Sequence, residues 1–497
     1  MIELSLPEIA EIVGGRTHRD GGQRVTGTVE FDNREIGEGG LFVALPGERV
    51  DGHTFAVAAV RAGAACVLAA REVDAPAVIV PPADGPEHSG TALALAGDTD
   101  GSGRAVLAAL GKLARHVAEV LTRGGLSVIG VTGSSGKTSA KDLITALLEP
   151  LGPTIAPPGS FNNELGHPWT VLRADTATRH LVLELSARGH GHIAALAELA
   201  PPHLGVVLNV GTAHIGEFGS QEAIASAKGE LVEALPDNGV AVLNTDDPLV
   251  SAMRARTGAR VLGFGIGAEA HIRARDVTLD THARASFELV TPSGSARVSL
   301  GLYGEHHVAN ALAAAAVAYE LGTPVVDIAA RLDVATPRSA GRMAVRTRAD
   351  GVRFLDDSYN ANPESMRAGL KALATMSRGT RSWAVLGELS ELGSDSVSAH
   401  DDVGRLAVRL GVDKLVVVAA AGSDAVAIHT GASHEGLWGE EPALVPDIDA
   451  ARTLLHEQLR PGDVVLVKAS NAMGMGRLVD ALVTTDVDAA GSHGDRL

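Results

Sequence analysis

Apolar residues along this chain alternate between short unbroken runs and longer stretches with helical spacing. The runs LSVIGV at 126–131 and LVLEL at 181–185 have the length and composition of buried strands. Between them, residues 137–152 place their leucines and isoleucine three or four positions apart, which predicts an amphipathic helix. A strand candidate at 204–210 and a helix candidate at 220–235 continue the alternation. Strands that alternate with helices predict an α/β fold with a mostly parallel sheet.

The same alternation resumes in the last third of the chain. Further strand candidates are VRFLDD, SWAVLG, KLVVVAA and DVVLVKAS, and a helix is expected to begin near Pro363. Linker candidates occur at 83–103, which is rich in Gly, Asp, Ser and Thr, and at 331–343. Residues 484–497 have the composition of a frayed tail. A length of 497 residues predicts two to four domains joined by such linkers.

Charge and cysteine content narrow the class of protein. The formal net charge of −18 argues against nonspecific binding to nucleic acid or to an anionic membrane. The single cysteine, Cys66, lies in an apolar run and cannot form an internal disulfide. The N-terminus has no basic region typical of a signal peptide, and no apolar stretch reaches the roughly 18 residues that span a bilayer. We therefore expect a soluble cytoplasmic protein.

The stretch GVTGSSGKTSAKD, residues 130–142, is a candidate phosphate-binding loop between a strand and a helix. The strict loop pattern requires a glycine where this chain has Val131, so a Gly/Ser-rich turn without nucleotide is the alternative. We favour nucleotide binding because Gly136, Lys137 and Thr138 occupy the positions that the mechanism needs. Backbone N–H groups and Lys137 would hold phosphates, and the Thr138 hydroxyl would hold Mg²⁺.

Three further residues could act at the same edge of the sheet. Glu184 ends one predicted strand and His214 follows another, and ligands of α/β sheets bind at the carboxyl ends of strands. Each alone is also typical of a solvated acid or a structural histidine. Lys228 shares the apolar face of the 220–235 helix, whose candidate N-cap is Ser220. Such a lysine either extends its amine to solvent or is desolvated with a perturbed pKa.

Polar loops also follow three strands in the last third of the chain. They read DDSYNANPESM, LGELSELG and KASNAMGMG. Prolines and asparagines there are compatible with ordinary turns. Three polar loops at the carboxyl edge of one sheet nevertheless indicate a binding face.

Taken together, these motifs resemble the Mur ligases, the ATP-dependent amide ligases of peptidoglycan synthesis. The resemblance covers residues 1 to about 483 and includes DNREIGEGGLFVALPGERVDGHTF, FNNELGHP, NVGTAHIGEFGSQEAIASAKGE, LNTDDP and GEHHVANALAA besides the loops already quoted. In this family the flanking glycine of the phosphate loop falls at the Gly130 position, so Val131 is not a defect. The resemblance implies three domains: 1–102, a small α/β domain that binds the UDP-sugar; 103–334, the central ATP-binding domain with a mostly parallel sheet; and 335–497, a Rossmann-like domain that binds the incoming amine.

The resemblance also implies roles for individual residues. Lys137, Glu184, His214 and Lys228 would be catalytic, and Thr138, Glu184, His214 and Lys228 would hold Mg²⁺, with Lys228 carbamylated. The implied ATP-binding residues are Gly133, Ser134, Ser135, Gly136, Lys137, Thr138, Ser139, Asn310, Arg342 and Asp357, with Asp356 as the alternative to Asp357. Asn310 lies opposite the apolar stripe of its helix and need not be in the core. The implied substrate contacts are Asn33, Arg34, Asn163, Ser186, Asn360 and Asn362.

Within the family, the loop DDSYNANPESM implies the ligase that adds D-alanyl-D-alanine to UDP-N-acetylmuramoyl-tripeptide through an acyl phosphate, using ATP and Mg²⁺. Two positions depart from the pattern: Asn33 replaces a serine of the uridine motif, and Ser186 replaces a glycine. A serine at the position of Ser186 resembles the sibling ligase that adds the third stem residue, so that sibling is an alternative. The D-N-P-R motif of the sibling is absent from this chain. The motifs are also compatible with a folylpolyglutamate-synthase-like ligase, a regulatory P-loop ATPase or an inactive homologue. No nucleic-acid partner, no membrane insertion and a monomer are expected.

Overall fold

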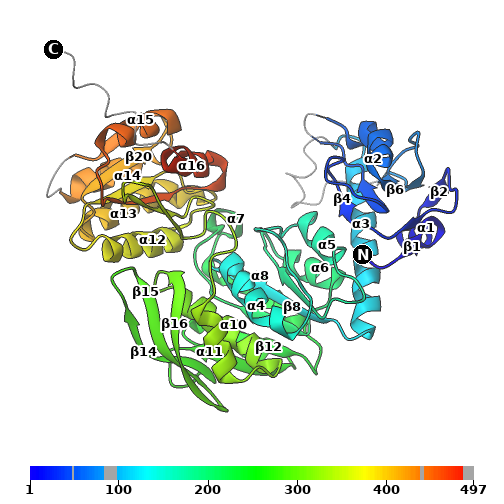
Figure 1. The fold of residues 1–497 in the computed structure, drawn as a ribbon, viewed down its shortest axis with the longest axis horizontal. Coiled ribbons are helices and arrows are strands. Elements are labelled where there is room, and N and C mark those ends of the chain that lie inside the picture. Colours follow the sequence, from blue (N-terminus) through cyan, green and yellow to red (C-terminus); the bar gives the residue numbers. More distant parts are fainter. Residues whose placement is uncertain (48–49, 83–97, 437–440, 485–497) are drawn as a thin grey trace.

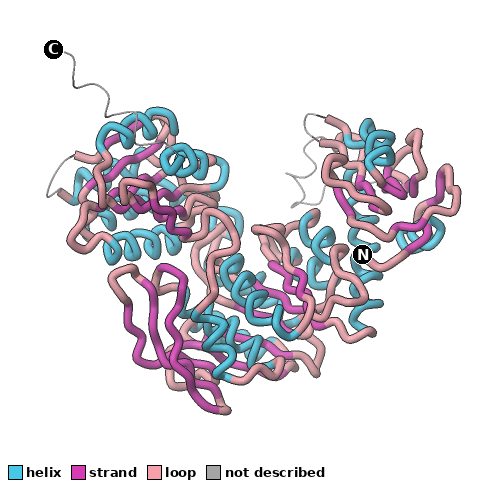
Figure 2. Tube along the Cα trace, viewed as in Figure 1, coloured by secondary structure: helices cyan, strands magenta, loops and turns pink. Residues whose placement is uncertain are grey.

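The computed structural model describes residues 1–47, 50–82, 98–436 and 441–484 (Figures 1 and 2). Most of the first linker candidate and nearly all of the tail candidate lie outside these residues. Three main sheets follow one another along the chain, and we call them the N-terminal, central and C-terminal sheets. The described parts form an open U in Figure 1, with the central sheet at its base. Among the described residues, no helix combines the length and apolar character needed to cross a bilayer.

The N-terminal sheet has five strands in the order β2-β7-β6-β5-β4, parallel except for the β2–β7 pair. Its strands are β2 (Arg16–His18), β4 (Val29–Glu30), β5 (Gly40–Val43), β6 (Ala64–Ala69) and β7 (Ala77–Ile79). The antiparallel pair β1 (Leu4–Ser5) and β3 (Arg24–Val25), helices α1 (Leu6–Val13) and α2 (Ala56–Ala62), and the 3₁₀ turn η1 (Gly52–Phe55) complete this part.

Helix α3 (Ser102–Arg123) links the N-terminal part to the central sheet. Its apolar residues belong to one continuous core cluster with residues of α1, of the N-terminal strands and of the central strands. The helix begins at Ser102, so the last two residues of the first linker candidate, 83–103, are helical instead. The predicted linker extended two residues too far, because the first turn of α3 is polar and the apolar face of this helix begins after it.

The central sheet confirms the expected alternation and adds an antiparallel extension. Its nine strands have the order β16-β15-β14-β13-β12-β11-β8-β10-β9, and the pairs from β9 to β14 are parallel. The strands are β8 (Ser127–Thr132), β9 (Thr154–Ile155), β10 (His180–Glu184), β11 (Leu204–Val207), β12 (Val240–Asn244), β13 (Arg260–Gly265), β14 (Ile272–Leu279), β15 (Arg284–Thr291) and β16 (Gly294–Tyr303). Strands β14, β15 and β16 form an antiparallel meander that was not predicted from the sequence.

Helices cover the central sheet and bring the phosphate-loop helix into its core. They are α4 (Lys137–Leu148), α5 (Gly166–Val171), α6 (His192–Leu199), α7 (Ile215–Phe218), α8 (Gln221–Glu233), α9 (Pro248–Ala252), α10 (His307–Glu320) and α11 (Val325–Asp333), with 3₁₀ turns η2 (Glu149–Leu151) and η3 (Met253–Arg256). Alanine-rich α10 packs against α4 within one apolar cluster, since small side chains permit close helix approach. Because α11 extends to Asp333, the second linker candidate is shorter than 331–343.

The C-terminal sheet has the order β17-β18-β22-β19-β20-β21, with only the β17–β18 pair antiparallel. Its strands are β17 (Ala344–Thr347), β18 (Arg353–Asp356), β19 (Ser382–Leu386), β20 (Lys414–Val418), β21 (Ala443–Val445) and β22 (Val464–Lys468). Its helices are α12 (Pro363–Met376), α13 (Ser396–Arg409), α14 (Val426–Glu435), α15 (Ile448–Gln458) and α16 (Gly476–Thr484), with 3₁₀ turns η4 (Gly393–Asp395) and η5 (Asn471–Met473). Strands β18, β22 and β19 are neighbours, so the three polar loops that follow them meet at one edge.

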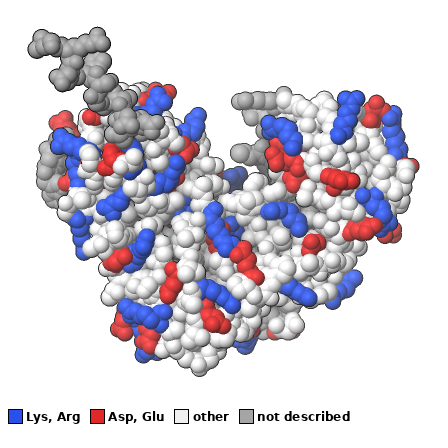
Figure 3. Space-filling view, in the orientation of Figure 1, with Lys and Arg blue, Asp and Glu red and all other residues white. Residues whose placement is uncertain are grey.

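The molecular surface is hollowed between the two arms of the U (Figure 3). On the face shown, acidic and basic residues are interspersed over both arms. No block of basic residues appears on this face, in keeping with the acidic composition.

Candidate active site

The phosphate-loop candidate connects β8 to α4, as the sequence predicts. Gly136 adopts a left-handed conformation with φ of 81° just before the first residue of α4. The loop is held by Asn209, whose side-chain oxygen accepts from the Ser135 N–H at 2.9 Å and whose backbone oxygen accepts from the Ser134 N–H at 3.1 Å. The N-terminus of α4 therefore directs free N–H groups and a positive dipole at the space above the loop.

Lys137 starts α4 and donates to the Gly133 carbonyl at 2.8 Å. Burial lowers the pKa of its amine, and the nearby Glu184 carboxylate opposes that shift. A desolvated lysine beside main-chain N–H groups is suited to an anion, because it gains more from a phosphate oxygen than from a carbonyl.

Glu184 ends β10, directly beside β8, and its side chain is fully buried. Its carboxylate accepts from Thr138 Oγ1 at 3.1 Å, from Ser160 Oγ at 2.8 Å and from Asn162 Nδ2 at 2.8 Å. Thr138 Oγ1 in turn accepts from Arg342 Nη2 at 3.2 Å. The expected meeting of Thr138 and Glu184 at one sheet edge is confirmed.

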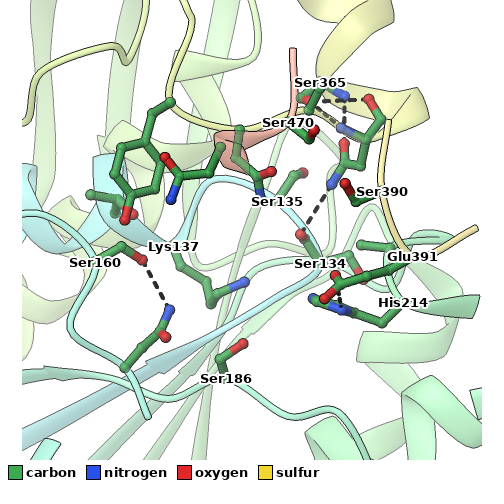
Figure 4. A pocket seen from close by; sticks show the side chains of 18 of the residues that line it. Ser134, Ser135, Lys137, Ser160, Ser186, His214, Ser365, Ser390, Glu391 and Ser470 are labelled. Atoms are coloured by element: carbon green, nitrogen blue, oxygen red, sulfur yellow. Dashed lines mark hydrogen bonds and ion pairs between the residues drawn. The ribbon is translucent and has the colours of Figure 1, made fainter. Parts of the chain in front are cut away.

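His214 reaches the same space from the loop after β11. Its backbone is left-handed, with φ of 64°, and Nδ1 lies 2.5 Å from Glu391 Oε2, which is an ion pair when the ring is protonated (Figure 4). Glu391 belongs to the loop after β19 of the C-terminal sheet, and Arg188 Nη2 lies 3.7 Å from its other oxygen. His214 thus connects a loop of the central sheet to a loop of the C-terminal sheet.

Lys228 is buried on α8, and Ser220 caps that helix by accepting from the Ala223 N–H. The side chain is 4% exposed, so the interpretation in which its amine reaches solvent is wrong. Desolvation, reinforced by the positive charge of Lys137, lowers the pKa of Lys228 well below its ordinary value. Within the described part of the chain the amine has no hydrogen-bond or ion-pair partner. This environment favours a neutral and chemically reactive amine.

The donor set at this edge fits Mg²⁺ in part. Thr138 and Glu184 supply the hard oxygen ligands that Mg²⁺ prefers, and substrate phosphates usually supply others. His214 offers its second ring nitrogen, whereas an ammonium on Lys228 could not ligate a cation and a carbamate could. The described residues hold no cluster of three or more His, Cys, Asp and Glu side chains suited to a metal. The site is therefore suited to a magnesium ion held jointly with phosphates.

A cavity of about 500 Å³ gathers many of the predicted residues between the central and C-terminal sheets. Figure 4 shows Lys137, Ser186, His214 and Glu391 around this space. The predicted residues that line it are Ser134, Ser135, Gly136, Lys137, Thr138, Asn163, Glu184, Ser186, His214, Arg342, Asn360 and Asn362. Ser139 and Arg342 line a smaller neighbouring cavity.

The remaining predicted residues, among them Gly133, line neither cavity, and Lys228 lies buried beside Lys137. Asn33 and Arg34 lie in the turn after β4, where Arg34 pairs with Asp32 at 2.5 Å. Asn310 and Asp357 are both buried.

Asn310 is buried although it lies opposite the apolar stripe of its helix. It is 4% exposed, and its side-chain oxygen would be 2.5 Å from a Cβ atom at Gly136. The face opposite the stripe is buried because α10 is covered on nearly every side. Asn310 thus packs directly beneath the phosphate loop.

The Asp357 carboxylate forms a buried ion pair, and Asp357 does not line the cavity. Its Oδ2 atom lies 2.6 Å from Lys468 Nζ, and its Oδ1 atom accepts from the Met343 N–H at 3.2 Å. Burial lowers the pKa of Lys468, and the charge of Asp357 opposes that shift. Asp356 instead accepts from the Ser358 hydroxyl at 2.6 Å, and its pKa is raised by burial.

We expect Asp357→Asn to lower the free energy of unfolding by about 3 kcal/mol, because it leaves the Lys468 ammonium buried without a counter-charge. Urea unfolding followed by circular dichroism measures this loss. Asp356→Asn is the matched control, since a hydroxyl hydrogen bond is worth only about 1 kcal/mol. Equal losses in the two variants would contradict the assignment of the buried pair to Asp357.

Several residues of the site escaped prediction although their motifs were noticed. Ser160 and Asn162 precede or lie in FNNELGHP, Glu391 lies in LGELSELG, and Arg188 follows Ser186 by two positions. The sequence signal was polar character after a strand. Which polar residue contacts Glu184 or His214 depends on loop conformation, which no periodicity encodes.

Comparisons with known proteins agree on one family. Family models match as the Mur ligase family, catalytic domain (residues 27–95), the Mur ligase middle domain (131–318) and the Mur ligase, glutamate ligase domain (341–471). The UDP-N-acetylmuramoyl-tripeptide–D-alanyl-D-alanine ligase of Mycobacterium tuberculosis (strain ATCC 25618 / H37Rv) is 57% identical, over 98% of this chain and 99% of its own.

Solved structures give the same result. A crystal structure of MurF from Acinetobacter baumannii is similar with a TM-score of 0.80 and 29% identity, over 97% of this chain and 99% of that one. The MurF ligase from Thermotoga maritima in complex with ADP is similar with a TM-score of 0.74 and 30% identity, over 92% of this chain and 97% of that one.

Proposed function

Since this chain belongs to the Mur ligase family, we infer that it joins D-alanyl-D-alanine to UDP-N-acetylmuramoyl-tripeptide with conversion of ATP to ADP and phosphate. It is an ATP-dependent amide ligase of peptidoglycan synthesis. The reaction would be a cytoplasmic one, and the enzyme would act as a monomer.

The observation that carries this function is the shared cavity. One wall consists of the phosphate loop with Lys137 and the carboxylate of Glu184, from the central sheet. The opposite wall consists of loops from the C-terminal sheet that include Asn360 and Asn362. A cavity that faces a nucleotide-binding loop on one side and a second polar loop cluster on the other suits a reaction of three substrates.

In the proposed reaction, the terminal carboxylate of the tripeptide attacks the γ-phosphorus of ATP. The bond from that phosphorus to the bridging oxygen breaks, which gives an acyl phosphate and ADP. The amine of D-alanyl-D-alanine then adds to the acyl carbon and loses a proton, and the tetrahedral intermediate expels phosphate. Lys137 reduces the repulsion between carboxylate and triphosphate, as do the N–H groups at the start of α4.

We assign Thr138, Glu184, His214 and a carbamylated Lys228 to the binding of Mg²⁺. When bound, Mg²⁺ would supply positive charge to the phosphate oxygens. Ser160 and Asn162 hold the Glu184 carboxylate in place, and Arg342 holds the Thr138 hydroxyl.

We also assign three domains to the chain: 1–102 for the UDP-sugar end with Asn33 and Arg34, 103–334 for ATP and 335–497 for the dipeptide. The separate sheets support this division. Asn163 and Ser186 would contact the tripeptide near the reacting carboxylate, because they share the cavity with Lys137.

Phosphate release in the presence of ATP and UDP-N-acetylmuramoyl-tripeptide tests the function. We expect turnover with D-alanyl-D-alanine and at least about 100-fold less with any single amino acid, since a missing residue forfeits its binding energy in the transition state. Turnover with a single amino acid and none with the dipeptide would favour the sibling ligase that adds the third stem residue, which Ser186 resembles at its position. Phosphate release that needs no amine would favour a P-loop ATPase.

A further inference from the structure

Glu391 and His214 form a contact between two sheets in which both backbones are left-handed. The φ angles are 65° for Glu391 and 64° for His214, a region that side chains other than glycine seldom adopt. Figure 4 shows the two side chains pointing toward one another at the edge of the cavity. Backbone strain of this kind persists where surrounding structure fixes it, and it is concentrated at functional sites.

The surrounding backbone fixes this geometry closely. A Cβ atom at Gly216 would lie 2.5 Å from the Gly393 nitrogen, and one at Gly393 would lie 2.7 Å from the Gly216 Cα atom. The Gly216 N–H also donates to the Glu391 carbonyl at 3.3 Å. Two glycines, each two residues beyond a member of the ion pair, thus let the two loops touch through their main chains.

The charge of Glu391 is not needed to hold the loops together. Its side chain is 34% exposed and that of His214 is 20% exposed, and ion pairs in contact with solvent contribute little to stability. A second carboxylate, Glu364 of α12, joins the same two parts of the chain by accepting from the Thr212 N–H at 2.7 Å and from its hydroxyl at 2.9 Å. Docking therefore has other sources, and the particular effect of Glu391 is on the His214 ring.

We propose that Glu391 is a positioning residue, supplied by the C-terminal sheet, that orients the His214 imidazole for the ligase reaction. The carboxylate holds Nδ1 and so leaves Nε2 as the ring nitrogen available to the cavity. A carboxylate at one ring nitrogen fixes the orientation of a histidine and the tautomer of its neutral form. Arg188, 3.7 Å from the other oxygen, restrains the same carboxylate.

This arrangement makes the activating half of the site depend on the amine-binding half. The loop that contains Glu391 follows β19 and lines the same cavity as Asn360 and Asn362, which lie in the loop after β18. His214 is oriented only while these loops are docked on the central sheet. An acyl phosphate would therefore form only where the incoming amine can reach it, which limits its loss to water. This inference rests on the proposed function.

The first test compares Glu391→Gln with Glu364→Gln. Glutamine keeps the size of each side chain, and Glu364 is the matched control because it bridges the same parts without touching His214. We expect Glu391→Gln to lower kcat about 10- to 100-fold, the usual effect of removing an outer partner of a functional histidine. The Kd for ADP in the presence of EDTA should stay within about twofold of the wild-type value, because Glu391 acts on Lys137 only through its charge and forms no hydrogen bond or ion pair with the phosphate loop.

A double-mutant cycle with His214→Ala separates positioning from docking. If Glu391 acts through His214, Glu391→Gln has no further effect on kcat in the His214→Ala background, whereas the effect of Glu364→Gln, of whatever size, is the same in both backgrounds. Additive effects of Glu391→Gln and His214→Ala would overturn the proposal. Failure of the wild-type protein to turn over the dipeptide would instead count against the proposed function.

Interdomain distance provides a readout independent of activity. Cys66 is buried, so fluorophores can be placed on Ala255→Cys in the central part and Thr430→Cys in the C-terminal part, both of which replace exposed residues. We expect the same transfer efficiency with and without Glu391→Gln. A changed efficiency would mean that Glu391 serves docking, and would overturn its assignment as a positioning residue for His214.

Discussion

Replacing Lys137 with alanine is expected to lower phosphate release about 10³-fold, at the upper end of the effect of removing one preorganised charge-stabilising group. The Lys137 amine is bonded to the Gly133 carbonyl at 2.8 Å at the start of α4, beside Glu184. With a triphosphate in the loop, that amine offsets the repulsion between the phosphates and the attacking carboxylate. Alanine retains the helix but removes the charge.

The matched control for this variant is Lys112→Ala on α3. Lys112 also donates to a backbone carbonyl, that of Val13, at 3.1 Å, but it is exposed on α3 and does not line the cavity. We expect Lys112→Ala to lower the melting temperature and to leave kcat within about threefold, because it is remote from the cavity. A normal rate in Lys137→Ala would remove the phosphate role from this loop.

The position of Glu184 could be predicted because an apolar run and the residue that ends it are recognised from a few neighbouring residues. An apolar run that ends in an acid places that acid at the carboxyl edge of a parallel sheet, and β10 does so beside β8. The same holds for the helix start at Pro363, where Asn362 caps α12, and for the apolar face that carries Lys228. These features need only a pattern of a few residues.

The antiparallel meander β14–β16 had a sequence signal that was not used. In RASFELVT, residues 284–291, Ala285, Phe287, Leu289 and Thr291 are buried and alternate with half-buried residues. This period of two is typical of a strand with one core face. The interpretation as a purely alternating α/β region overlooked this period, which continues at Val298, Leu300 and Leu302 of β16.

Other features of the site depend on contacts between distant segments. The ion pair of Glu391 with His214 joins loops separated by more than 170 residues along the chain. Likewise, Asp357 pairs with Lys468, which comes from the neighbouring strand β22. The motif resemblance implied that Asp357 contacts the nucleotide. A motif does not reveal whether a carboxylate is already neutralised by a partner from another strand.

Lys228→Ala is the second variant with a large expected effect. It should lower activity about 10²- to 10³-fold, and added carboxylates should restore part of that activity. The amine is buried without an anionic partner among the described residues, and its pKa is lowered by desolvation and by Lys137. A neutral amine adds to CO₂ and releases one proton, which gives a carbamate. That anion would balance the Lys137 charge and offer an oxygen ligand at the site.

Two measurements check this carbamate. Removal of CO₂ from the buffer should lower wild-type phosphate release, and added bicarbonate should restore it, whereas Lys228→Arg should not respond to bicarbonate. Formate or acetate should restore part of the activity of Lys228→Ala, because alanine leaves room for a small carboxylate. Lys228→Arg is the control without that room, and its guanidinium neither forms a carbamate nor admits the anion. Activity of the wild type that is independent of CO₂, together with no rescue of Lys228→Ala, would mean that the buried amine acts unmodified.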